Sequence, residues 1–193
     1  MSENLILAST SAYRVKLLAQ LGIPFEQAAP DYTEITVANE SPEQRSRRLA
    51  EGKAGSINLS VQSDDIILGS DQVAHMADGT LLHKPGGFDA AREQLLRCSG
   101  QWVSFTTGIC LRSHSDTMVV DSETFRIRFR PLTETIIESY LRRDQPYDCA
   151  GSLKAEGLGI TLIGETDGRD INTLYGLPLM LLSDYLINLN ILL

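Results

Sequence analysis

Short apolar runs and polar turns alternate along the chain, and this alternation predicts buried strands mixed with amphipathic helices. Residues 5–8 are all apolar and therefore predict a buried strand. The polar stretch 9–11 supplies serine and threonine side chains that cap helices, and leucines at helical spacing follow across 12–21 until Gly22. The chain is expected to open as strand, polar turn and helix.

Capping residues mark the start of further helices. Ser41 and Gln44 can form a capping box around Pro42, so a second helix is expected from there to about residue 57. The remaining helices are expected at 88–97, from a cap at Thr133 to about 142, and at 179–189. Polar residues interrupt the leucine-rich stretch 177–193, so it is expected to pack on the core rather than to span a membrane.

The later strands are expected where apolar residues run together or alternate with polar ones, at 66–68, 73–76, 102–111, 124–130 and 160–163. The segment 69–72 is expected at the end of the first of these strands, and Asp78-Gly79 as a hairpin turn. In 124–130, apolar side chains alternate with arginines, which predicts one core face and one polar face. The predicted fold class is α/β, with a mixed twisted β-sheet and flanking helices.

The bulk composition limits the partners. No repeat or flexible linker divides the 193 residues, so a single domain over 1–193 is expected. The formal net charge of -8 should repel nucleic acid and anionic lipid, so neither a polynucleotide nor a membrane is an expected partner. A small anionic ligand is compatible with this charge only where cations gather locally.

Cysteine usage and the start of the chain indicate the compartment. The cysteines, Cys98, Cys110 and Cys149, are odd in number and lack zinc-ligand spacing, which argues against a disulfide framework and favours a reducing environment. The first residues carry neither a basic region nor a long apolar run, which argues against a signal peptide. The cytoplasm is therefore the expected location.

Two polar segments that follow buried strands are candidate sites, because a strand holds such residues rigidly. In the first, Ser9, Ser11 and Arg14 surround a helix start, where hydroxyls, backbone N–H groups and a guanidinium can bind a phosphate. Plain helix capping with a solvated arginine explains the same residues. In the second, Asp71 beside Gly69 can bind a metal or activate water, and an ordinary turn is the alternative.

Four further residues are weaker candidates when each is taken alone. Lys84 can be presented by a rigid proline-glycine loop, Glu34 lies in a polar loop, Lys53 lies on a helix, and Glu156 precedes a glycine-rich turn. Taken alone, Lys84 fits an ordinary turn better, and the other three positions fit solvated or exposed surface residues better.

Taken together and in this order, these segments resemble the Maf family of nucleotide pyrophosphatases from near residue 4 to near residue 185. The matching residues are 5–11 with Arg14, Leu17 and Leu18; Glu34; 49–50 with 53–54; 69–71; 84–85; 149–152 with 156–157; and 168–170 with 172–174 and 176–179. The resemblance implies a mixed α/β fold with two lobes around a cleft, related to the inosine-triphosphate pyrophosphatases.

The resemblance also implies the chemistry, which is hydrolysis of a nucleoside triphosphate between its α and β phosphates with a divalent cation, Mg²⁺ or Mn²⁺. It implies that Asp71 is the general base and that Glu34 helps Asp71 to hold the metal. It implies phosphate binding by Ser9, Ser11, Arg14, Lys53 and Lys84. The implied partner is a small nucleotide substrate, and a homodimer is one assembly that the family allows.

The resemblance implies one of two specificity branches of the family, one acting on dTTP and UTP and one on 7-methyl-GTP. The diagnostic positions here are Tyr13, Gln72 and Glu156. Gln72 and Glu156 match the 7-methyl-GTP branch, and Tyr13 keeps an aromatic ring where that branch has tryptophan. An aromatic face attracts the cationic methylated base by about 0.5–2 kcal/mol, and a carboxylate can accept from the guanine N1–H and amino group.

Several positions depart from the family pattern. Val15 replaces the second arginine of a pair, Ala12 replaces a proline, and Thr33 stands where an aspartate often precedes Glu34. Loss of the second arginine is expected to weaken phosphate binding or slow catalysis. The expected function is therefore a 7-methyl-GTP pyrophosphatase that removes a modified nucleotide, and the alternatives are a dTTP/UTP pyrophosphatase or a low-turnover nucleotide-binding regulator of cell division.

Overall fold

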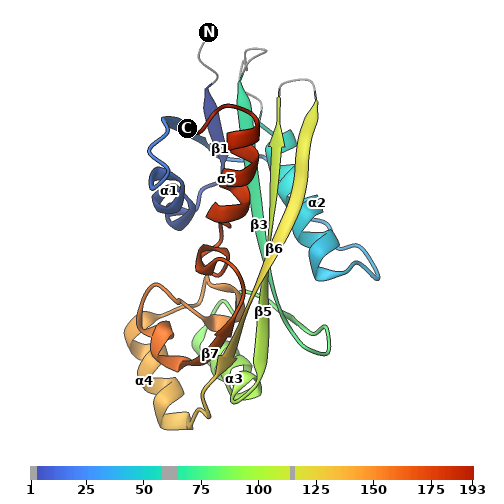
Figure 1. Cartoon of the computed structure of the whole chain (residues 1–193). Helices are drawn as coiled ribbons and strands as arrows, with labels where there is room; N and C mark the ends of the chain where they lie inside the picture. Colours follow the sequence, from blue (N-terminus) through green and yellow to red (C-terminus); the bar gives the residue numbers. More distant parts are fainter. Residues whose placement is uncertain (1–3, 58–64, 114–115) are drawn as a thin grey trace. The chain divides into compact units, whose positions relative to one another are not determined.

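The computed structural model describes residues 4–57, 65–113 and 116–193 (Figure 1). The α-helices are α1 (Ala12–Ala19), α2 (Pro42–Gly55), α3 (Phe88–Cys98), α4 (Glu134–Asp144) and α5 (Leu179–Asn188). The strands are β1 (Leu5–Ala8), β2 (Phe25–Ala28), β3 (Ile66–Met76), β4 (Leu81–Leu82), β5 (Trp102–Arg112), β6 (Thr117–Phe129) and β7 (Ile163–Asp167). Short 3₁₀ helices are η1 (Ala150–Ser152), η2 (Leu158–Leu162) and η3 (Ile171–Thr173).

These strands form one mixed sheet, which confirms the predicted α/β class. The order is β2-β1-β3-β5-β6-β7, and β4 pairs with β3. Strand β1 is parallel to both β2 and β3, whereas β4 is antiparallel to β3 and β7 is antiparallel to β6. Both pairing modes therefore occur among the described residues.

The chain divides into two compact units. The first comprises Met1–Gln72, Thr107–Glu123 and Asp170–Leu193, and the second comprises Val73–Thr106 and Thr124–Arg169. Strands β3, β5 and β6 each contribute residues to both units. The cleft that the family resemblance implies stays a prediction.

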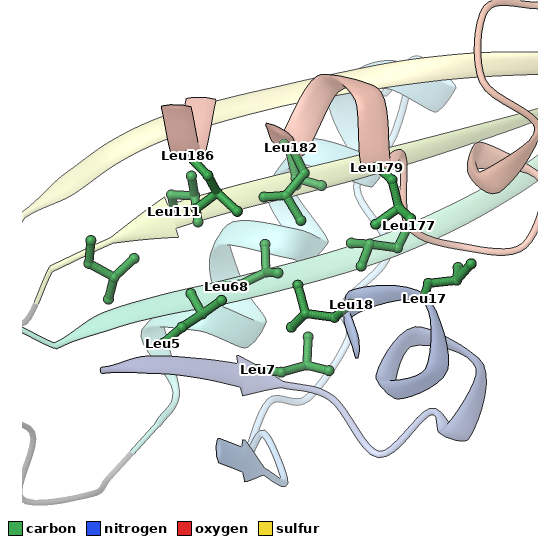
Figure 2. Close-up of a cluster of buried hydrophobic side chains, with 12 residues drawn as sticks. Leu5, Leu7, Leu17, Leu18, Leu68, Leu111, Leu177, Leu179, Leu182 and Leu186 are labelled. Carbon is green, nitrogen blue, oxygen red and sulfur yellow. The ribbon is translucent and has the colours of Figure 1, made fainter. Parts of the chain in front are cut away.

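In the first unit, strand β1 is buried on both faces, as its unbroken apolar sequence predicts. Leu5 and Leu7 point toward α1 and α5, where Leu17, Leu18 and Leu186 complete a leucine-rich cluster (Figure 2). The alternate residues of β1 lie in a second buried cluster with residues of α2: Ile6, Ala8, Ala50 and Ala54. Helices therefore cover both faces of the parallel strands, which the βαβ arrangement requires.

The C-terminal helix packs on this core, as expected. Leu182 and Leu186 of α5 are fully buried in the leucine-rich cluster (Figure 2). Across residues 4–57, 65–113 and 116–193, we find no helix with the length and hydropathy of a membrane span.

In the second unit, strand β6 shows the predicted alternation. Phe125, Ile127 and Phe129 are buried, while the intervening arginines are exposed. Arg126 and Arg128 pair with acidic residues of β7 at 3.1 and 2.9 Å. The arginine face of β6 is therefore a solvated surface that pairs with the neighbouring strand.

Strands β7 and β2 differ from what the sequence led us to expect. The strand expected at 160–163 is instead the 3₁₀ helix η2, and strand β7 begins at Ile163, where pairing with Phe129 starts. Strand β2 was not expected, because its sequence Phe-Glu-Gln-Ala lacks both an apolar run and a clear alternation. Its pairing with β1 is a tertiary backbone interaction that local sequence does not encode.

Helix α2 lies unusually close to strand β3, and this contact yields a stability prediction. A Cβ on Gly69 would lie 2.1 Å from the Ala50 carbonyl oxygen, so Gly69→Ala should destabilise the protein by about 1–3 kcal/mol or more. Gly87→Ala is the matched control, because a Cβ there meets nothing within 4 Å and should cost less than about 1 kcal/mol. Urea unfolding of both variants measures the difference, and equal midpoints would contradict the close packing.

Candidate functional site

The polar residues of the first unit gather where the parallel pairing of β1 with β3 stops. The last residue pair of that ladder joins Ala8 to Gly69. Strand β3 does not end there as expected but continues to Met76, so Asp71 lies within a continuous strand. Ser9 and Asp71 therefore both follow the last residue pair of the β1–β3 ladder, at the edge where the carboxyl end of β1 lies.

Lys53 links two carboxylates near this edge. Its ammonium donates a hydrogen bond to Asp71 Oδ1 and lies 2.9 Å from Glu34 Oε1. The side chains of Asp71 and Lys53 are only 11% and 15% exposed, whereas that of Glu34 is 45% exposed. The fold thus brings together an acid from a strand, a lysine from a helix and an acid from a loop.

Arg14 is held at the start of α1. The backbone N–H of Arg14 donates to the Ser11 hydroxyl at the helix cap, and the Ser11 N–H donates to Ser9 Oγ at 3.1 Å. The Arg14 guanidinium donates through Nε to the Gly176 carbonyl at 2.8 Å and through Nη1 to Ser9 Oγ at 3.4 Å. The arginine is therefore not a solvated side chain, which rules out the simple capping interpretation for this residue.

Arg14 stays charged although it is largely removed from water. Burial lowers the pKa of the Arg14 guanidinium, and the negative charges of Asp71 and Glu34 act in the opposite direction. Arginine stays protonated at neutral pH even after such a shift. The edge of the sheet therefore carries two cations, Arg14 and Lys53, beside two carboxylates.

The side-chain amide of Gln72 forms hydrogen bonds with the C-terminal part of the chain. Its Nε2 donates to the Thr107 hydroxyl at 3.1 Å and to the carbonyls of Thr173 and Leu174 at 2.8 and 3.1 Å. Because carbonyl oxygens only accept, the amide nitrogen must face them. Only the amide oxygen of Gln72 is then left for a ligand.

The other predicted residues fall in different places. Tyr13 is partly buried on α1, immediately before Arg14. Lys84 and Glu156 are exposed residues of the second unit, Lys84 just after β4 and Glu156 between η1 and η2. Val15, where the family has a second arginine, packs against the leucine-rich core cluster.

Arg48 is a residue that the sequence interpretation missed. Its guanidinium pairs with both carboxylate oxygens of Glu40 at 2.6 and 2.8 Å and donates to the Ile35 carbonyl and the Tyr32 hydroxyl. The hydrogen bond from Arg48 lowers the pKa of Glu40, so the pair stays ionised at neutral pH. Arg48 thereby fixes the loop that carries Glu34. The spacing of Glu40 and Arg48 around the Ser41 cap was the available signal.

The carboxylates of the site do not form a ready-made metal cage. In the described part of the chain, no group of three or more His, Cys, Asp or Glu side chains is placed to hold a metal ion. Glu34 and Asp71 nevertheless direct oxygen atoms at one ammonium, so their shared position suits a cation.

Comparison with known proteins agrees with the resemblance seen in the sequence. The family described as Maf-like protein matches residues 4–189. A protein of Nitrosococcus oceani named 7-methyl-GTP pyrophosphatase is 46% identical over 187 residues, covering 95% of this chain and 92% of the relative. A protein of the same name from Pseudomonas putida is 47% identical over 183 residues, covering 94% of each.

Similarity to solved structures is weaker. A HAM1 protein from Coxiella burnetii superposes with a TM-score of 0.44 at 12% identity, covering 66% of this chain and 73% of that chain. This similarity is too low to support a conclusion about function.

The Arg48 contacts predict the order of the Glu34 loop. Arg48→Lys keeps the charge but loses the planar fork that grips Glu40, so amide hydrogens in residues 30–40 should exchange about tenfold faster. Arg47→Lys is the matched control, because the pair of Arg47 with Asp121 is 45% and 30% exposed and contributes little. Hydrogen–deuterium exchange with mass spectrometry measures both variants, and unchanged exchange in Arg48→Lys would contradict the clamp.

Proposed function

The chain belongs to the Maf family, and from this premise we propose that it hydrolyses 7-methyl-GTP to 7-methyl-GMP and pyrophosphate. The observation that carries the proposal is that Asp71 and Glu34 both form ion pairs with Lys53. The charges of the same two acids also act on Arg14. The names of the relatives supply the substrate class. The family match spans residues of both compact units, which supports one domain over 1–193.

Asp71 is the general base of the proposed reaction. Its carboxylate accepts a proton from water while the water oxygen forms a bond to the α phosphorus. The bond between that phosphorus and the bridging oxygen breaks, and pyrophosphate leaves with the electron pair. Lys53 holds the Asp71 carboxylate in one direction through its hydrogen bond, so the base does not have to be ordered during the reaction.

The cations and hydroxyls of the proposed site bind the phosphates. A triphosphate carries about four negative charges, which an acidic protein must offset locally. Arg14 has guanidinium N–H groups beyond its contacts with Gly176 and Ser9, and Ser9 and Ser11 add hydroxyls at the start of α1. Lys53 and, in the second unit, Lys84 supply further positive charge.

A divalent cation, Mg²⁺ or Mn²⁺, fits this donor set. Magnesium is commonly held by one or two carboxylates together with substrate phosphates, and Glu34 and Asp71 are two carboxylates that face one cation, the Lys53 ammonium. Bound there, the metal would supply charge neutralisation to the phosphates and polarise water.

Base selection is assigned to Glu156, Tyr13 and Gln72. The Glu156 carboxylate accepts from the N1–H and amino group of the guanine, and hydrogen bonds to a charged group contribute about 1.5–3 kcal/mol each. Tyr13 stacks on the cationic methylated ring. Gln72 contributes through its amide oxygen, since its nitrogen already holds the Thr173 and Leu174 carbonyls.

The cellular setting is part of the same proposal. The protein acts on a free nucleotide in the cytoplasm, without a polynucleotide or membrane partner, and a homodimer is its proposed assembly. Packing of Val15 into the core keeps one alternative open, a low-turnover nucleotide-binding regulator, because the second arginine of the family pair has no counterpart at this position.

Pyrophosphate release with magnesium tests the proposal, with 7-methyl-GTP, GTP, UTP and dTTP compared at equal concentration. A kcat/KM at least about tenfold higher for 7-methyl-GTP is the expected result. Preference for UTP or dTTP would favour the other branch, and nucleotide binding without turnover would favour the regulator.

Asp71→Asn tests the assigned base. The amide keeps the shape of the side chain but cannot take a proton from water, so turnover should fall at least about a thousandfold while nucleotide still binds. Asp78→Asn is the control, because Asp78 is an exposed turn residue of the second unit. Single-turnover assays and calorimetric binding measure the two quantities, and full activity of Asp71→Asn would overturn the mechanism.

Glu156→Gln tests the assigned base reader. Loss of the charge should lower kcat/KM for 7-methyl-GTP and relax discrimination against uracil and thymine nucleotides by about tenfold. The same four-nucleotide assay measures the profile, and a profile identical to that of the unaltered protein would remove Glu156 from the base contact.

A further inference from the structure

Glu156 lies in a tight turn of the second unit, and its direction depends on how that turn is held. The N–H groups of Gly157 and Gly159 both donate to the Lys154 carbonyl, at 3.0 and 3.1 Å. Glu156 is therefore enclosed by a backbone loop of only a few residues. The following inference rests on the proposed function, in which Glu156 reads the base.

Helix α4 contacts this turn through two side chains one helical turn apart. The Tyr140 hydroxyl accepts from the Lys154 N–H at 2.8 Å, and Asp144 Oδ2 accepts from the Leu158 N–H at 2.6 Å. Residues four apart share one face of a helix. The two contacts grip backbone N–H groups two residues before and two residues after Glu156.

Tyr140 also ties the turn to the segment before it. Its hydroxyl donates to the Ser152 carbonyl at 3.2 Å, and Gln94 donates to the Ser152 hydroxyl at 2.9 Å and to the His83 carbonyl at 3.2 Å. Burial raises the pKa of Tyr140, so the hydroxyl keeps its proton for this contact. The same network therefore reaches the residue that precedes Lys84.

Gly157 is shaped to the Asp144 carboxylate. A Cβ on Gly157 would lie 2.6 Å from Asp144 Oδ2 and 3.2 Å from Oδ1. A side chain at position 157 would push this carboxylate away from the Leu158 N–H. The glycine next to Glu156 is therefore explained by the close approach of Asp144.

We propose that Tyr140 and Asp144 are positioning residues that fix the direction of the Glu156 carboxylate and thereby set base selectivity. A contact with both N1–H and the amino group needs two carboxylate oxygens in one orientation, and loss of either backbone anchor lets the turn rotate. The proposed base Asp71 and the cations Arg14 and Lys53 belong to the first unit. Loosening the turn around Glu156 should therefore lower selectivity rather than hydrolysis of every nucleotide.

The test measures kcat/KM for 7-methyl-GTP and for UTP in Asp144→Ala and Tyr140→Phe. Each variant should reduce the ratio of the two values by about tenfold. Asp148→Ala and Tyr147→Phe are the matched controls, because these side chains lie in the same unit and anchor neither Lys154 nor Leu158. The control variants should keep the ratio of the unaltered protein.

Combination with Glu156→Gln separates positioning from a merely structural role. If Tyr140 and Asp144 act through Glu156, their substitutions should leave the ratio unchanged in the Glu156→Gln background. A purely structural role would lower kcat/KM for both nucleotides equally, together with the melting temperature, and would overturn the inference. Tyr140→Phe retains the ring and serves where Asp144→Ala does not fold.

The unaltered protein distinguishes this inference from the function on which it rests. If it shows no preference for 7-methyl-GTP, the proposed function fails and the inference fails with it. If it shows the preference and both anchor variants keep it, the inference alone fails.

Discussion

The close approach of helix α2 to the sheet is the constraint on which the proposed site depends. Gly69 of β3 and Gly108 of β5 have no side chain, and a Cβ on either would lie within 2.3 Å of a carbonyl oxygen of α2. This proximity places Lys53, near the end of α2, within hydrogen-bonding reach of Asp71 on β3. The ion pair is partly buried, so it is less screened by salt than a surface pair.

Further hydrogen bonds and ion pairs in the first unit hold the segments that contribute to the proposed site. The Arg48–Glu40 clamp orders the loop that brings Glu34 to Lys53. The Gly176 carbonyl accepts from both Arg14 and Ser70, with Gly176 at φ +101°, a conformation that side-chain-bearing residues rarely adopt. The proposed phosphate-binding groups are thus oriented before a ligand arrives, which lowers the entropy cost of binding.

In the second unit, too, supporting residues hold the segment that carries a proposed site residue. Helix α4 supplies Tyr140 and Asp144, whose side chains form hydrogen bonds with backbone groups on either side of Glu156. An exposed acid on a free turn would sample many directions, whereas one on an anchored turn samples few. The role of Glu156 in base selection comes from the family resemblance, and under the proposal this backbone support gives its carboxylate one direction.

The sequence by itself determined the fold class, most element positions and the family, because apolar periodicity, helix caps and ordered motifs are local signals. The proposed roles of Asp71, Arg14 and Lys53 came from that family resemblance. Only the tertiary structure decided that β3 continues past Asp71. It also decided that the Gln72 amide nitrogen donates to Thr173 and Leu174, and that Asp144 anchors the turn around Glu156. These contacts join residues whose pairing depends on how the chain packs, and a local pattern carries no record of its distant partner.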